Sequence, residues 1–310
     1  MKSLLAIGLI ATVAFAAFDA DEVKSMPMWG KLNHKMFSGY LDIKGTAKKL
    51  HYIFVESQSE PSKDPVLIWF NGGPGCASMG GMLAEHGPWV IEDGENVFHE
   101  NEWSWNKEAN VLYLNQPAGV GYSQCPNDDE CWFDDELSSL DNVAAVTFFF
   151  EQKFPEFLAN PLYISGESYA GIYVPYLAYQ IHKQNKAGHK TQINLKGVAV
   201  GNGLADYTYD THPAFIDMGY YHGLMSQELK DKIKEKGCDY SNMEWRAEEI
   251  SEECQQYMVE FMQTTRFANV NIYDIYGKCY LDHGEEQARR MVDSEIVGGE
   301  EKIFKLGVTF

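Results

Sequence analysis

The chain alternates between short apolar runs and longer segments that are apolar on one side only. The short runs are rich in β-branched and aromatic residues, which is typical of strands. They cover residues 50–55, 66–70, 111–114, 162–164 and 198–200. Between them, Leu137, Leu140, Ala144 and Phe148 recur at spacings of three and four, which predicts a helix with one apolar stripe that ends near Phe154. Strands that alternate with helices predict an α/β fold with parallel crossovers.

The first 17 residues have the pattern of a secretory signal peptide. Lys2 supplies a positive charge, residues 4–15 form a short apolar core, and Ala14 and Ala16 give a cleavage signature of small residues. A buried first helix is the alternative. No other apolar run approaches the roughly 18 residues that a membrane span requires. We therefore expect a soluble mature protein, secreted or lysosomal, with no membrane span.

The net charge of the chain limits which kinds of molecule it is expected to bind. The 310-residue chain carries 45 acidic and 25 basic residues, a formal net charge of −20. This excess excludes nucleic acid as an expected partner, because its phosphates would be repelled. It also fits an acidic compartment, in which some carboxylates take up protons and self-repulsion falls.

The six cysteines fit an oxidising compartment. Cys125 and Cys131 enclose a short polar loop. Cys238 and Cys254 bracket an acidic, helix-favouring stretch, and we expect them to form a disulfide. The two that remain, Cys76 and Cys279, could pair with each other, stay free, or lack partners in this chain.

Ser168 is the candidate nucleophile. It lies in the stretch Gly-Glu-Ser-Tyr-Ala-Gly at residues 166–171, with an apolar run before it and a predicted helix, residues 169–182, after it. A serine on such a strand-turn-helix is held in a strained conformation with its hydroxyl exposed at the sheet edge, which is how α/β-hydrolases present a nucleophile. It still needs a base, a group that orients the base, and donors for the oxyanion.

A glycine-rich loop at residues 71–76 follows the predicted strand 66–70. In hydrolases with an elbow serine, one oxyanion donor is an N–H of such a loop and the other is the N–H of the residue after the serine. This nominates Gly73 and Tyr169. Taken alone, the loop is more simply a tight turn. The elbow motif elsewhere in the chain favours the oxyanion hole.

Six stretches of the chain, in this order, resemble the serine carboxypeptidases: residues 69–76, 85–88, 110–114, 117–123, 166–171 and 201–203. The resemblance spans about residues 31 to 279. It implies an α/β-hydrolase fold with an incomplete central sheet, formed by residues 18–205. It also implies a helical cap insertion at residues 206–283, and it leaves residues 284–310 as a divergent tail.

The resemblance implies roles for individual residues. Ser168 would be the nucleophile, and Cys76 and Cys279 would each bond a cysteine further along. The residues that would hold the terminal carboxylate of a peptide are Asn71, Gly72, Glu85 and Glu167. The family's catalytic Asp and His belong to a C-terminal stretch that this chain lacks, so we expect it to be nearly silent in catalysis. The histidines after the elbow are expected to be structural or on the surface: His182, His189, His212, His222 and His283.

The carboxylate site also makes chemical sense from the residues. An enzyme that acts on chain ends must bind a free carboxylate, to which Asn71 and the Gly72 N–H can donate. If Glu85 and Glu167 lie together they share a proton, one pKa is raised, and the protonated carboxyl can donate to the substrate. The alternative for Glu85 is a solvated helix residue.

These observations predict a serine-type carboxypeptidase that releases C-terminal amino acids from peptides through an acyl-enzyme, without metal or cofactor. The first alternative is a non-catalytic member that binds peptide C-termini or a protein partner. The second is an acyltransferase or esterase on the same scaffold. The set of Asn71, Glu85 and Glu167 favours peptide termini over esters.

Overall fold

The computed structural model describes residues 19–27, 29–91, 97–126, 131–241, 249–267, 270–271 and 273–277. The expected signal peptide and divergent tail lie outside the described residues, as do Cys279 and His283. The chain divides into two compact units, Met1–Ala205 and Asp206–Phe310, and each is described by itself.

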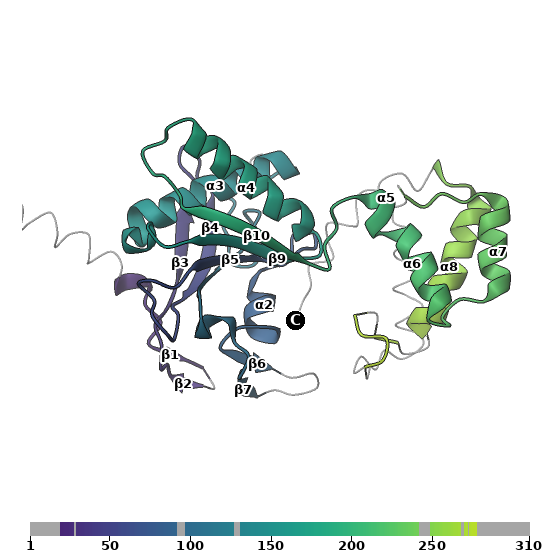
Figure 1. Cartoon of the computed structure of the whole chain (residues 1–310), viewed down its shortest axis with the longest axis horizontal. Coiled ribbons are helices and arrows are strands. Elements are labelled where there is room, and N and C mark those ends of the chain that lie inside the picture. Colours follow the sequence, from purple (N-terminus) through teal and green to yellow (C-terminus); the bar gives the residue numbers. More distant parts are fainter. Residues whose placement is uncertain are drawn as a thin grey trace, which may run out of the picture. The chain divides into compact units, whose positions relative to one another are not determined.

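A six-stranded sheet forms the centre of the first unit, in the order β10-β9-β5-β8-β4-β3 (Figure 1). Strands β5, β8, β9 and β10 pair in parallel, whereas β3 and β4 form an antiparallel hairpin and β4 pairs antiparallel with β8. The bounds are β3 Met36–Asp42, β4 Lys49–Val55, β5 Val66–Phe70, β8 Asn110–Leu114, β9 Leu162–Glu167 and β10 Leu195–Gly201. This mixed, mostly parallel sheet with helices confirms the predicted α/β class.

All five predicted strand segments lie within these strands, but β3 was missed. Its sequence is interrupted by Ser38 and Gly39, so it lacks a continuous apolar run. Two short hairpins were also missed: β1 (Ser25–Met26) with β2 (Gly30–Lys31), and β6 (Trp89–Ile91) with β7 (Phe98–Glu100). The short single-turn elements are η1 Asp19–Asp21, η2 Trp105–Lys107, the π-helix η4 Phe149–Lys153 and η5 Pro155–Phe157.

Helices cover both faces of the sheet. Helices α3 (Asp135–Phe148) and α4 (Ala170–Lys186) pack against each other on one face, and α2 (Met79–Ala84) lies on the other (Figure 1). Both predicted long helices are therefore present. The chain leaves α3 through η4, and Phe149, Phe150 and Phe154 are buried there.

The stripe predicted for α3 is not its buried face. Leu137 and Leu140 are 40% and 43% exposed. The buried side chains include Ser138, Ser139, Asp141 and Asn142. Three of these polar groups have partners outside the helix, and the pairs are Gln180 with Ser139, Asn142 with Gln116, and Lys48 with Asp141. Because buried polar groups are tolerated once they are hydrogen-bonded, tertiary partners and not the apolar spacing decided which face turns inward.

Strand β10 is the edge of the described sheet. Its side chains Val198 and Val200 are 51% and 43% exposed. Its backbone pairs with β9 on one side, from Leu195 with Leu162 to Gly201 with Glu167. An apolar strand with one open side is an available pairing surface.

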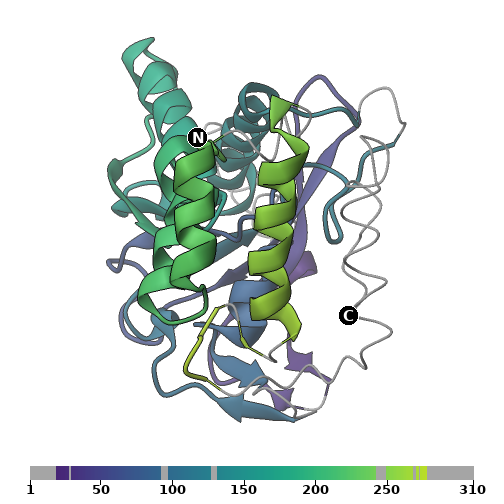
Figure 2. The same ribbon diagram turned by 90° about the vertical axis from the view of Figure 1, so that its right-hand side faces the viewer.

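The second unit is helical, with α5 Tyr207–Asp210, α6 His212–Tyr221, α7 Gln227–Lys236 and α8 Glu252–Phe267. Helices α7 and α8 lie side by side (Figure 2). Apolar side chains from α6, α7 and α8 form its core, which comprises Ile216, Met225, Leu229, Ile233, Tyr240, Cys254, Met258 and Phe261.

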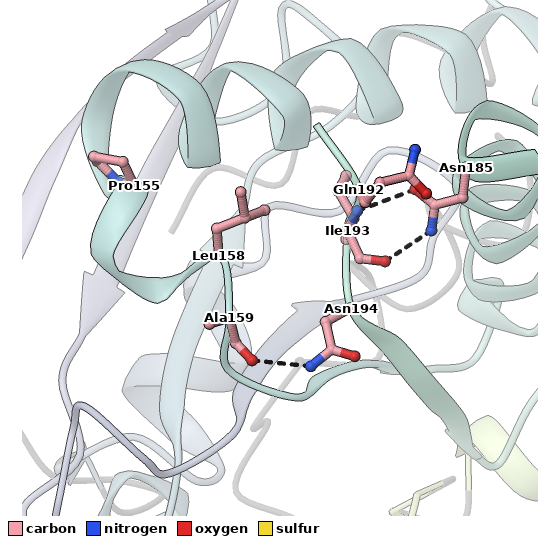
Figure 3. Close-up of a pocket in the computed structure, with 7 residues that line it drawn as sticks. All are labelled: Pro155, Leu158, Ala159, Asn185, Gln192, Ile193 and Asn194. Atoms are coloured by element: carbon pink, nitrogen blue, oxygen red, sulfur yellow. Dashed lines mark hydrogen bonds between the residues drawn. The ribbon is translucent and has the colours of Figure 1, made fainter. Parts of the chain in front are cut away.

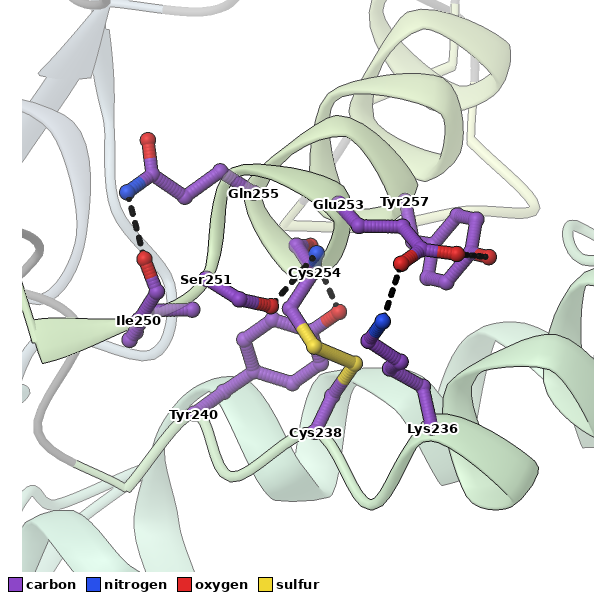
Figure 4. Close-up of a disulfide and its surroundings, with 9 residues drawn as sticks. All are labelled: Lys236, Cys238, Tyr240, Ile250, Ser251, Glu253, Cys254, Gln255 and Tyr257. Atoms are coloured by element: carbon purple, nitrogen blue, oxygen red, sulfur yellow. Dashed lines mark hydrogen bonds and ion pairs between the residues drawn. A yellow bond between two sulfur atoms is a disulfide. The ribbon is translucent and has the colours of Figure 1, made fainter.

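A disulfide between Cys238 and Cys254 joins the segment after α7 to the first turn of α8 (Figure 4). Beside it, the Tyr240 hydroxyl donates to the Cys254 carbonyl at 2.7 Å. A second disulfide joins Cys125 and Cys131 in the first unit, and Cys76 is an exposed thiol with no disulfide partner among the described residues. No helix within the described ranges is long and apolar enough to cross a membrane.

Candidate active site

The turn after β9 presents Ser168. The strand ends immediately before this residue and α4 begins at Ala170. The φ of Ser168 is 58°, in the left-handed region that non-glycine residues rarely adopt. Its N–H donates to the Gly201 carbonyl at 3.2 Å, and its carbonyl accepts from Gly171 at 2.9 Å and Leu204 at 2.8 Å. A strained serine held by three backbone hydrogen bonds has the geometry of a nucleophile elbow.

The glycine-rich loop after β5 lies directly against this elbow. A Cβ on Gly72 would be 2.4 Å from the Tyr169 nitrogen and 2.8 Å from the Ser168 Cβ. Gly73 has a φ of 110°, and its N–H makes no hydrogen bond within the described part of the chain. The two predicted oxyanion donors, the N–H groups of Gly73 and Tyr169, therefore belong to segments that touch beside Ser168.

Replacing Gly72 by alanine is expected to destabilise the protein by about 1 to 3 kcal/mol, the usual cost of overpacking a filled site. The added methyl group would overlap the Tyr169 nitrogen, a backbone atom that cannot turn aside. Urea unfolding measures the change. Gly201→Ala is the matched control, because nothing lies within 4 Å of its Cβ position. Equal stability of the two variants would show that the loop does not contact the elbow.

Asn71 links the loop to two glutamates that are far apart in the sequence. Its Oδ1 accepts from the Trp69 indole Nε1 at 3.0 Å and from the Gly81 N–H at 2.8 Å. These two donors fix the amide, so that Nδ2 must face the other way. Nδ2 donates to Oε1 of Glu85 at 3.0 Å and to Oε1 of Glu167 at 2.9 Å. One amide therefore holds both carboxyl groups beside the elbow.

Negative charge is concentrated at this amide. The pKa of Glu85 is raised above its ordinary value, mainly because partial burial disfavours the carboxylate, while the Asn71 hydrogen bond opposes the shift and Glu167 adds repulsion. The pKa of the Cys76 thiol is also raised, first by partial desolvation from neighbouring groups and then by the charge of Glu167. A Glu85 carboxyl that keeps its proton can donate a hydrogen bond to an anion.

Sequence reasoning gave no role to three residues that shape this site. They are Trp69 and Gly81, which fix the Asn71 amide, and Tyr173, whose hydroxyl accepts from the Gly75 N–H at 3.1 Å. Strand alternation could have identified Trp69, because side chains two positions apart point to the same side of a strand. Gly81 and Tyr173 reach the loop only through tertiary contacts.

No histidine or aspartate in the described part of the chain is hydrogen-bonded to the Ser168 side chain. The histidines that follow it occupy other positions: His182 near the C-terminal end of α4, His189 in the loop after α4, and His212 and His222 in the second unit. His189 bonds to Thr191 within its own turn. The described residues thus include a candidate nucleophile and candidate oxyanion donors, and none of their histidines or aspartates is hydrogen-bonded to the serine side chain.

Metal-ligating clusters and surface hollows are the other features that can form sites. Within the described ranges, no group of three or more His, Cys, Asp or Glu side chains could hold a metal ion. A hollow in the first unit is lined by Pro155, Leu158, Ala159, Asn185, Gln192, Ile193 and Asn194 (Figure 3). Two of its polar side chains bond to the backbone of apolar lining residues, Asn185 to the N–H and carbonyl of Ile193 and Asn194 to the carbonyl of Ala159. It lies where β9 and β10 begin, at the opposite end of the strands from Ser168.

Comparison with known proteins places the chain in a family. The serine carboxypeptidase family matches residues 27–304. The chain is 39% identical over 285 residues to serine carboxypeptidase-like 20 of Arabidopsis thaliana, and 37% identical over 265 residues to the lysosomal protective protein of Mus musculus. These alignments cover 90% and 85% of the chain but 55% and 54% of the relatives. The chain belongs to the serine carboxypeptidase family and spans about half the length of the curated relatives it matches.

A solved structure gives the same answer for the fold. Kex1(delta)p, a prohormone-processing carboxypeptidase from Saccharomyces cerevisiae, matches with a TM-score of 0.60 and 26% identity, over 75% of this chain and 53% of that one. The predicted α/β-hydrolase fold is confirmed.

Proposed function

We propose that this chain carries the nucleophile, the oxyanion donors and the substrate-carboxylate site of a serine carboxypeptidase, and that it recognises the free C-terminus of a peptide. The observation that carries the proposal is the Asn71 amide, which holds Glu85 and Glu167 beside the elbow of Ser168. An ester or an internal peptide bond offers no anion for such a site to bind. In this proposal the helical second unit is the cap.

Binding would proceed through two donors. A Glu85 carboxyl that retains its proton donates to one oxygen of the terminal carboxylate, and the Gly72 N–H donates to the other, while the Asn71 amide keeps both glutamate carboxyl groups in place. This anchoring presents the last peptide carbonyl to Ser168. Attack by its hydroxyl oxygen would form a tetrahedral oxyanion that the Gly73 and Tyr169 N–H groups stabilise. Loss of the terminal amino acid would then leave an acyl-enzyme, which water hydrolyses.

Replacing Glu85 by glutamine is expected to flatten the pH dependence of binding. The pKa of Glu85 is raised, so its proton is present below that pKa and is lost as the pH rises through it. Affinity for a free-acid peptide should therefore fall by up to about tenfold per pH unit above that pKa. Glutamine is a neutral donor at every pH. Fluorescence polarisation with a labelled peptide between about pH 4.5 and about pH 7.5 measures this, around the ordinary range of a glutamate.

The control for that variant is the amide of the same peptide, which presents no carboxylate. Its affinity should be equally weak for the wild type and Glu85→Gln at every pH. If the free-acid peptide shows the same pH profile with both proteins, Glu85 is a solvated helix residue without a role.

An acidic lysosomal or secretory setting suits the proposed chemistry. Two disulfides favour an oxidising compartment. A site that needs a proton on a carboxyl group binds best at acidic pH. The net charge of −20 also repels itself less there.

A second candidate function is binding without turnover. The observation that favours it is the lack, within the described residues, of a base at Ser168. A protein with the carboxylate site alone would capture peptide C-termini and release them unchanged.

One experiment tests both. The purified protein is incubated with a peptide and with its C-terminal amide, and mass spectrometry follows the products. A carboxypeptidase removes one residue at a time from the free acid and spares the amide. A non-catalytic member binds the free acid and leaves its mass unchanged. Internal cleavage, or equal treatment of acid and amide, would contradict both functions.

A further inference from the structure

His86 is buried next to the carboxylate site but takes no part in the steps above. The residue is 6% exposed. It stacks on Trp105 with a centroid distance of 4.0 Å and planes 16° apart, and it meets Trp69 edge-on at 4.2 Å and 76°. We call Trp69, His86 and Trp105 the aromatic clamp. The third pair of the clamp, Trp69 with Trp105, is also edge-on, at 5.3 Å and 88°.

The clamp is connected to the acid pair through one hydrogen bond. The Trp69 indole N–H donates to Asn71 Oδ1, and the Nδ2 of the same amide donates to Glu85 and Glu167. A tilt of the Trp69 indole would take away one of the two donors that fix Oδ1, the other being the Gly81 N–H. The ring of His86 packs edge-on against this indole.

The backbone of His86 is fixed as well as its ring. Its N–H donates to the Gly81 carbonyl at 2.9 Å, and its carbonyl accepts from the Trp105 N–H at 3.0 Å. The Asn101 amide bonds to the carbonyls of the flanking residues Glu85 and Gly87, at 3.3 Å and 3.0 Å. These hydrogen bonds fix the backbone of residues 85–87, which carries both the His86 ring of the clamp and the Glu85 carboxyl group.

The surroundings keep the imidazole neutral. Its Nδ1 is 3.2 Å from the Tyr113 hydroxyl, and its buried Nε2 has no partner in the described structure. Burial lowers the pKa of His86 to about 4 and raises that of Tyr113, on which Glu85 also acts. The titratable groups around the ring are therefore Tyr113 on β8 and Glu85 at the end of α2. Because the ring is neutral, it brings no positive charge that would compete with the substrate-binding donors for the carboxyl groups of Glu85 and Glu167.

We propose that His86 is a positioning residue for the carboxylate site, a flat ring that keeps the Trp69 indole N–H on the Asn71 amide. The inference rests on the proposed function, since it assigns His86 a part in recognising a peptide C-terminus. The competing explanation is a histidine that only fills the core. Such a residue would change stability when replaced but not the preference for a carboxylate.

The test compares two substitutions in the full chain. His86→Phe keeps a flat ring in the clamp, and His86→Leu keeps apolar volume without one. The dissociation constants of a free-acid peptide and of its amide are measured for each. We expect His86→Leu to raise the dissociation constant of the free-acid peptide about tenfold and to leave that of the amide unchanged. A tenfold change is the loss that follows from misplacing one hydrogen bond to a charged group. His86→Phe should stay within about threefold of the wild type, because stacking and not hydrogen bonding does the positioning.

The matched control is His51→Phe, because His51 is also 6% exposed, and its ring nitrogens bond to Ser38 and Asn115 instead. It should affect the free acid and the amide alike. The proposal is overturned if His86→Leu binds the free-acid peptide as tightly as the wild type does, or if it loses affinity for the acid and the amide equally. It is also overturned if His86→Phe loses affinity for the free-acid peptide.

A second readout keeps this inference separate from the proposed function. The Trp69 indole N–H signal in a ¹H–¹⁵N spectrum, assigned with Trp69→Phe, should move in His86→Leu and stay in place in His86→Phe. If the wild type does not distinguish acid from amide, the proposed function fails, and the indole signal still decides whether His86 positions Trp69. An unmoved signal in His86→Leu overturns the inference by itself.

Discussion

In a form of the protein that has a base at Ser168, replacing Ser168 by alanine is expected to abolish covalent labelling by a fluorophosphonate and to lower peptide hydrolysis by several orders of magnitude. The reason is the strained elbow, which exposes this hydroxyl beside the N–H groups of Gly73 and Tyr169. Intact mass and peptide mapping after reaction with the reagent locate and quantify the label.

Ser165, in strand β9 just before the elbow, offers the matched control. It is 2% exposed and donates to the Ile68 carbonyl at 2.9 Å, so a reagent cannot reach it. Ser165→Ala should be labelled as the wild type is. A label on any serine other than Ser168, or full labelling of Ser168→Ala, would contradict the assignment of the nucleophile.

Replacing Asn71 by leucine is expected to weaken binding of a free-acid peptide by about a hundredfold or more. Both hydrogen bonds to the carboxyl groups of Glu85 and Glu167 disappear, and hydrogen bonds to charged groups each contribute about 1.5 to 3 kcal/mol. The two carboxyl groups would then repel each other with no shared donor between them. Calorimetric titration with the peptide and its amide measures the loss.

That substitution also leaves the Trp69 indole N–H without its acceptor, so stability must be separated from recognition. Asn160→Leu is the control, because Asn160 is a buried amide whose Nδ2 likewise donates twice, to the carbonyls of Pro61 and Asp64. It should unfold more easily but keep its preference for the free acid. An Asn71→Leu protein that retains the wild-type preference would remove Asn71 from the site.

The fold was predictable where a signal is local. Strands β5 and β8 are buried on both faces, so they appear in the sequence as unbroken apolar runs. Strand β3 contains Ser38 and Gly39 and carries no such run. The inward face of α3 was mispredicted because the partners of Asp141 and Asn142, which are Lys48 and Gln116, come from distant segments. No spacing within the helix reveals them.

In the site, too, the local signals were predictable and the tertiary contacts were not. Ser168 and Gly73 belong to short sequence motifs, so the sequence alone identifies them as candidates. The sequence could suggest Glu85 and Glu167 separately, but only the fold shows that one amide holds both. The aromatic clamp was invisible in the sequence, because His86 and Trp105 meet Trp69 through tertiary packing alone.

The central claim is that a proton-dependent carboxylate site recognises a peptide C-terminus. Its most direct test is a calorimetric comparison of one peptide with its C-terminal amide at about pH 5 and at about pH 7.5, because the pKa of Glu85 is raised above the ordinary value of a glutamate. The account predicts that the wild type binds the free acid at least about tenfold more tightly than the amide at the lower pH. It further predicts that this preference shrinks at the higher pH, with proton uptake on binding there. Equal affinity for acid and amide at both pH values would contradict the account.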